Sequence, residues 1–133
     1  MQHNFQSYVA EIEKTHSVIE PHIKNTPLLN SKELDTKLGM QVFCKAENLQ
    51  VTGSFKIRGA LSAISRLTDE QLKKGVLAYS SGNHAQGVAK AANCYGTKAT
   101  IVMPKDAPSI KIEKTQSFNP KIIFYDRESE VRE

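Results

Sequence analysis

The sequence is poor in the residues that mark several common classes of protein. It has 133 residues, no tryptophan and only two cysteines, Cys44 and Cys94, neither of which belongs to a C-x-x-C pair. A disulfide framework and a metal site are therefore disfavoured, and we expect buried, inert thiols in a reducing compartment. No apolar run approaches the ~20 residues of a membrane helix. The first residues lack the basic and apolar regions of a signal peptide, which favours a cytoplasmic protein without a membrane partner.

An excess of one charge is also nearly absent. Lys and Arg number 18 against 14 Asp and Glu, and the net charge of +4 is spread evenly with no basic block. This pattern gives no support to a nucleic-acid partner. Hydrophobic residues make up 39% of the chain, which is enough for a core and excludes a mainly disordered protein.

The second half of the sequence alternates apolar strands with helices. Strands are predicted over 76–79, 99–103 and 121–125, and helices over 83–95 and 108–118. Strands this apolar, joined by helices, indicate a parallel sheet that is covered by helices on both faces. Residues 127–133 resemble the start of another helix. The sequence therefore predicts an α/β protein.

The first half is less regular. Helices are predicted over 6–20, between Ser31 and Gly39, over 54–67 and between Thr68 and Gly75, and a strand over 41–46. The helix after Thr68 begins with a capping box that pairs this residue with Gln71.

The loop before the 54–67 helix carries a lysine in an unusual place. Gly53 lets the backbone turn, Ser54 can cap the helix, and Lys56 lies in the first helical turn. The partial positive charge at a helix N-terminus disfavours a cation there. It therefore favours the neutral amine that acts as a nucleophile. A solvated surface lysine is the alternative, since most lysines are exposed.

A second loop, Ser80–Gly87, joins the 76–79 strand to the next helix. Its small hydroxyl residues, its glycine and the free N–H groups of a helix N-terminus form a cradle for a carboxylate or phosphate. The P-loop pattern is incomplete, because Val88 and Ala89 stand where Lys and Ser or Thr are required, so nucleotide binding is disfavoured. The alternative is an ordinary loop capped by serine and asparagine.

Together the two loops resemble those of a known enzyme family. Ser-Phe-Lys-Ile-Arg-Gly-Ala at 54–60 and Ser-Ser-Gly-Asn-His-Ala-Gln-Gly at 80–87 are similar to the motifs of fold type II pyridoxal-phosphate (PLP) enzymes, above all the threonine/serine dehydratase and serine racemase family. The resemblance implies a tryptophan-synthase-β-like α/β fold with parallel sheets flanked by helices. It also implies that residues 1–74 form the N-terminal part of the large PLP domain and residues 75–133 most of the small domain.

The resemblance further implies a role for individual residues. Lys56 matches the lysine bonded to PLP as a Schiff base, Phe55 matches the aromatic residue against the pyridine ring, and Asn83 matches the side chain that hydrogen-bonds the ring 3′-oxygen. The loop expected to receive the substrate carboxylate consists of Ser80, Ser81, Gly82, Asn83 and His84. Arg132 matches an arginine near the substrate in serine racemases, with a solvated surface role as the alternative.

The implied reaction is β-elimination, in which L-threonine or L-serine gives a 2-oxo acid and ammonia and Lys56 acts as the base at the α-carbon. Ser81 leaves alternatives open. Typical threonine dehydratases have alanine at this place, whereas serine racemases have a serine that acts as acid and base opposite the lysine, and hydroxyaspartate dehydratases look similar. The alternative is that the Ser81 hydroxyl takes no part in proton transfer and only binds the substrate carboxylate. The family also implies a homo-oligomer whose small-molecule partner is a hydroxy amino acid.

The glycines mark a departure from the family pattern. All seven are isolated, whereas the family binds the PLP phosphate with a run of consecutive glycines. The chain is therefore incomplete relative to the family. A hypothesis of a different class follows, namely a truncated, non-catalytic chain that cannot hold PLP by itself.

Overall fold

Three parallel strands form the central sheet of the computed structural model, which describes residues 5–129. Strands β3 (Val76–Tyr79), β4 (Ala99–Pro104) and β5 (Lys121–Tyr125) lie side by side in that order. Helix α5 (Asn83–Cys94) connects the first pair and helix α6 (Ser109–Gln116) the second. The predicted alternation of strands and helices is confirmed.

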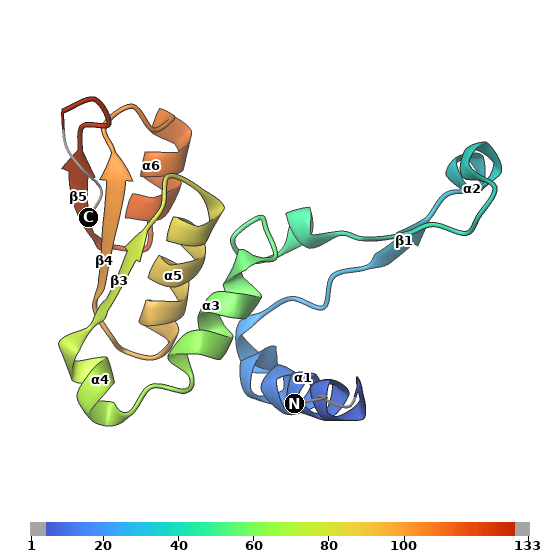
Figure 1. Cartoon of the computed structure of the whole chain (residues 1–133), viewed down its shortest axis with the longest axis horizontal. Coiled ribbons are helices and arrows are strands. Elements are labelled where there is room, and N and C mark those ends of the chain that lie inside the picture. Colours follow the sequence, from blue (N-terminus) through green and yellow to red (C-terminus); the bar gives the residue numbers. More distant parts are fainter. Residues whose placement is uncertain (1–4, 130–133) are drawn as a thin grey trace.

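Only one face of this sheet is covered by helices within the described residues. Both α5 and α6 pack on the same face (Figure 1), because successive parallel crossovers of one hand along a sheet place their helices on one side. The buried side chains of the covered face are Ala78, Ala99, Ile101 and Met103. Alternate residues point the other way, and Leu77 is 72% exposed and Ile123 42% exposed. The prediction of helices on both faces is therefore wrong for this part of the chain.

Helix α3 (Lys56–Ile64) packs across α5 as a further layer. Its buried residues, Ile57, Ala60, Leu61 and Ile64, follow the helical period predicted from the sequence. The close approach depends on Gly87 in α5. A Cβ atom there would lie 3.1 Å from the carbonyl carbon and the carbonyl oxygen of Lys56. The absence of a side chain at Gly87 thus lets the first turn of α3 rest against α5.

The start of α3 differs from the prediction. The helix begins at Lys56 instead of Ser54, and Phe55 precedes it without a side-chain capping bond. Gly53, with φ of +71°, belongs to the turn that ends just before the helix. Ser54 lies before the helix, and its hydroxyl is buried with no hydrogen-bond partner among the described residues.

The N-terminal helix α1 (Phe5–Ile19) continues into a short 3-10 helix η1 (Glu20–His22). Its amphipathic pattern is confirmed as a helix, although Ile19 is its only buried residue among those described. Helix α4 (Asp69–Lys74) lies between α3 and β3 and begins with the predicted capping box, in which Thr68 and Gln71 bond each other's backbone N–H groups.

An extended arm carries the remaining elements. Strands β1 (Leu28–Asn30) and β2 (Phe43–Lys45) pair antiparallel, helix α2 (Lys32–Leu38) joins them, and η2 (Glu47–Leu49) leads back to α3. Figure 1 shows the arm reaching away from the helical layers. Cys44, in the middle of β2, is exposed, so the prediction of buried thiols is wrong there; Cys94 is half-buried.

The helix predicted over residues 127–133 lies only partly within the described residues. Residues 127–129 form a turn, and residues 130–133 lie outside the described residues. Over residues 5–129, none of the helices has both the length and the apolar character needed to span a bilayer.

Candidate active site

The two predicted loops meet at one edge of the fold. Lys56 is the first residue of α3, and its carbonyl group lies against Gly87 of α5. The other loop, Ser80–Gly82, leaves the carboxyl end of β3 and leads into α5. In open parallel sheets, ligands bind at this end of the strands. The packing of α3 on α5 therefore places the lysine turn beside the loop that is expected to hold an anion.

Two hydrogen bonds donated by backbone N–H groups shape the loop after β3. The N–H of Ser80 donates to the carbonyl of Val102 at 3.0 Å, and the N–H of Gly82 donates to Ser80 Oγ at 3.2 Å. Ser80, Ser81 and Gly82 are half-buried, while Asn83 and His84 are exposed. The first turn of α5 contains no acidic side chain. The partial positive charge at this helix end is therefore not balanced within its own first turn, which favours an anionic guest.

Lys56 lies next to an aromatic ring. Its Nζ is 4.8 Å from the centroid of the Phe55 ring. Both side chains are exposed, Phe55 by 58%. An amine and an aromatic face are thus presented together on the surface, within reach of a planar ligand.

An ion pair behind the lysine holds its turn in place. Arg58, two residues further along α3, donates from Nε to Glu47 Oε2 at 2.9 Å and from Nη2 to Oε1 at 2.8 Å. The Thr26 hydroxyl donates to Oε1 at 2.6 Å. The Arg58 bonds, with a smaller contribution from Thr26, lower the pKa of Glu47 to about 2 against the opposing effect of burial. Sequence reasoning did not assign this pair, although Arg58 belongs to the 54–60 segment that resembles the family.

A second missed residue lies beside Asn83. Lys111, in the first turn of α6, donates from Nζ to Asn83 Oδ1 at 2.8 Å. The two residues are distant in the sequence, and only the sheet topology brings the starts of α5 and α6 together. No local pattern in the sequence signals this contact.

The residues at this edge fit the ring end of PLP. They offer a primary amine at Lys56, an exposed aromatic face at Phe55 and an amide at Asn83. A metal centre finds no such support, since the described part of the chain holds no group of three or more His, Cys, Asp or Glu side chains that could bind an ion. Arg132, the other predicted substrate contact, lies outside the described residues.

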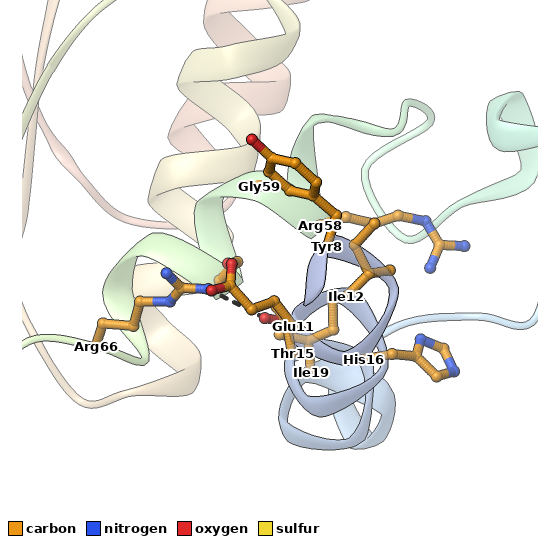
Figure 2. A pocket seen from close by; sticks show the side chains of 10 residues that line it. Tyr8, Glu11, Ile12, Thr15, His16, Ile19, Arg58, Gly59 and Arg66 are labelled. Atoms are coloured by element: carbon orange, nitrogen blue, oxygen red, sulfur yellow. Dashed lines mark hydrogen bonds between the residues drawn. The ribbon is translucent and has the colours of Figure 1, made fainter. Parts of the chain in front are cut away.

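A separate pocket of about 370 Å³ lies between α1 and α3 (Figure 2). Its lining includes Ile12, Ile19 and Gly59, and Arg66 at its edge donates to the Thr15 hydroxyl at 3.1 Å. None of the predicted site residues lines it. This pocket between α1 and α3 is thus distinct from the edge that carries the predicted site residues.

Comparison with known protein families identifies the class to which this α/β chain, with its lysine at the start of a helix, belongs. The chain belongs to the pyridoxal-phosphate dependent enzyme family, whose model matches residues 19–133.

Individual relatives narrow the class. The chain is 52% identical over 115 residues to an L-threo-3-hydroxyaspartate ammonia-lyase from a Pseudomonas species, covering 86% of this chain and 36% of the relative. It is 48% identical over 117 residues to the catabolic L-threonine dehydratase TdcB of Staphylococcus aureus, covering 87% of this chain and 34% of that protein. The solved structure of maize serine racemase superposes with a TM-score of 0.84 at 42% identity, over 89% of this chain and 36% of that one. The chain therefore spans about a third of the length of these relatives.

Proposed function

We propose that the protein is a PLP-dependent ammonia-lyase that converts a hydroxy amino acid, L-threonine or L-serine, to a 2-oxo acid and ammonia. The observation that carries this proposal is the contact between the Lys56 carbonyl and Gly87, which sets the lysine turn beside the Ser80–His84 loop. The relatives named as a threonine dehydratase and a hydroxyaspartate ammonia-lyase support the same reaction class.

Each loop has a part in this reaction. PLP, when bound, supplies an electron sink that makes the α-hydrogen of the amino acid acidic. Lys56 takes that proton at the α-carbon as a general base. The N–H groups and hydroxyls of residues 80–84 bind the substrate carboxylate and fix which face of the α-carbon meets the lysine. The exposed Phe55 ring would offer an aromatic face to the pyridine ring of PLP.

Racemisation is the second candidate activity, and Ser81 is the residue that favours it. A hydroxyl on the far side of the α-carbon from Lys56 returns a proton to the opposite face and inverts the centre. The likeness to maize serine racemase supports this candidate. A Ser81→Ala variant then loses conversion of L-serine to D-serine while it keeps formation of the 2-oxo acid. If D-serine is still formed, Ser81 is not the second acid.

The proposed role of Lys56 is tested by reductive trapping. We expect borohydride to fix PLP on Lys56 of the 133-residue chain at high PLP concentration, and peptide mass spectrometry to locate it there. Lys90, a half-buried lysine on α5, provides the matched control: Lys56→Ala abolishes the selective adduct and Lys90→Ala leaves it. Labelling spread equally over the lysines contradicts the proposal.

The activity itself is tested on the protein isolated at its natural length. Incubation with PLP and L-threonine or L-serine is expected to yield a 2-oxo acid that Lys56→Ala does not form. If the protein binds PLP but forms no 2-oxo acid, the proposed activity is wrong and the non-catalytic hypothesis replaces it.

The proposal also covers the domain organisation, the cellular location and the oligomeric state of the protein. Residues 1–74 form the beginning of a large PLP domain and residues 75–133 most of a small one. We place the protein in the cytoplasm, because Cys44 and Cys94 are both free thiols. The apolar side chains left exposed on the sheet and the arm support a homo-oligomer.

A further inference from the structure

Lys111 fixes which way the amide of Asn83 faces. A lysine ammonium is a donor with no acceptor atom, so the atom that meets Lys111 Nζ at 2.8 Å is the amide oxygen of Asn83. The Nδ2 group, with its two hydrogens, therefore faces away from Lys111. An amide held in this way presents donors, and never its acceptor oxygen, to a ligand on that side.

The backbone around Lys111 is itself well anchored. Its N–H donates to the carbonyl of Pro108 at 2.8 Å, and its carbonyl accepts from the hydroxyl of Thr115, which is fully buried, at 2.8 Å. The next residue, Ile112, packs against the core. The ammonium thus extends from a fixed helical turn, and the bond to Asn83 joins two rigid elements, α5 and α6.

The charge of Lys111 lies in an electrostatically unfavourable place. The first turns of both α5 and α6 lack acidic side chains, and each helix start carries partial positive charge. The partner of Lys111, an amide oxygen, carries no charge to offset this. The positive charge at this end of the two helices is thus not balanced by an acidic side chain of either first turn.

We propose that Lys111 is a positioning residue of this site: it holds the Asn83 amide so that Nδ2 donates to an acceptor oxygen of the bound ligand. The ligand class, a PLP-type phenolic oxygen, rests on the proposed function. The orientation of Asn83 does not depend on it. Without Lys111 the amide rotates freely, and its oxygen faces the ligand part of the time, where it repels an acceptor.

Two measurements test the orientation of the Asn83 amide and the binding of PLP separately. The first measurement is the NMR signal of the Asn83 side-chain NH₂ group in the full chain without PLP. We expect the two proton shifts to move in Lys111→Met and to return toward wild type in Lys111→Arg. Lys114→Met, one turn further along α6 with the same change in charge, is the control and leaves the signal in place. Unchanged Asn83 shifts in Lys111→Met overturn the proposal.

The second measurement is the affinity for PLP of the same variants. Loss of one charge-assisted hydrogen bond network weakens binding about tenfold in Lys111→Met, and Lys111→Arg restores most of it. Equal affinity in Lys111→Met and wild type overturns the role in binding. If wild type at its natural length binds no PLP at all, the proposed function fails, and the NMR shifts alone decide whether Lys111 orients Asn83.

Discussion

Among the charged side chains near Lys56, we expect Glu47 to contribute most to the stability of the turn that carries this lysine. Glu47 accepts two bonds from Arg58 and one from Thr26, and its side chain is only 15% exposed. Replacement by glutamine keeps the shape but removes the charge. We expect Glu47→Gln to lower the free energy of unfolding by about 1–2 kcal/mol, measured by urea denaturation at neutral pH.

A surface pair provides the control for this prediction. Lys37 and Glu33 form an ion pair at 2.9 Å along α2, but both side chains are mostly exposed. Such pairs contribute about 0.3–0.5 kcal/mol. Glu33→Gln should therefore change stability far less than Glu47→Gln. Equal effects would mean that the Glu47–Arg58 pair does not stabilise the turn.

The same carboxylate makes stability depend on pH. The pKa of Glu47 falls from 4.5 to about 2 on folding. Between these two pH values the folded chain therefore binds fewer protons than the unfolded chain. The stabilisation is complete above about pH 4.5 and is lost as the pH falls toward about 2. With partial solvent screening it amounts to about 1–2 kcal/mol. Urea midpoints across this range should fall less steeply in Glu47→Gln than in wild type, and parallel curves would contradict the assignment.

At the scale of elements, the approach of α3 to α5 depends on Gly87. A methyl group there would press on backbone atoms, the carbonyl of Lys56 at 3.1 Å and the nitrogen of Ile57 at 3.3 Å. Backbone cannot swing aside as a flexible side chain does, so α3 must move. We expect Gly87→Ala to destabilise the chain by about 1–2 kcal/mol, because the overpacking exceeds the gain in helix propensity. Thermal unfolding measures the change.

Gly59 on α3 is the matched control for that substitution. A Cβ atom at Gly59 would meet nothing within 4 Å, so Gly59→Ala gains only helix propensity and should stabilise by about 0.5–1 kcal/mol. Both substitutions add one methyl group to a helical glycine, but we expect Gly87→Ala to lower the free energy of unfolding and Gly59→Ala to raise it. If both stabilise, Gly87 is not a packing contact between the helices.

Elements that follow from local patterns could be predicted, and elements that depend on distant partners could not. The period of Ile57, Leu61 and Ile64 predicts α3, and the alternation after residue 75 predicts the sheet. Strand β1 has three residues and exists through its pairing with β2, so no period marks it. The motifs likewise locate Lys56 and Asn83 but not Lys111, because its contact is made by the order of strands and not by spacing along the chain.

At the scale of the whole molecule, two apolar surfaces are left uncovered in the described residues. On the arm, Leu28 is 61% and Phe43 56% exposed, and on the open face of the sheet Leu77 is 72% exposed. Contiguous exposed apolar surface is rare on soluble monomers and marks surfaces that another segment or subunit covers. The chain spans about a third of its relatives' length, which is consistent with surfaces that the remaining sequence of such proteins contacts.

These surfaces give the last prediction. The 133-residue chain alone should bind a dye specific for exposed apolar surface and should associate as its concentration rises, observed by light scattering. Leu77→Lys, on the open face of the sheet, should reduce both signals without loss of helical circular dichroism, because Leu77 contributes little to the core. Lys121, on the same face of β5, gives the control, since Lys121→Arg keeps the charge and should leave association unchanged. A chain that stays monomeric and binds no dye would show that these apolar side chains need no covering partner.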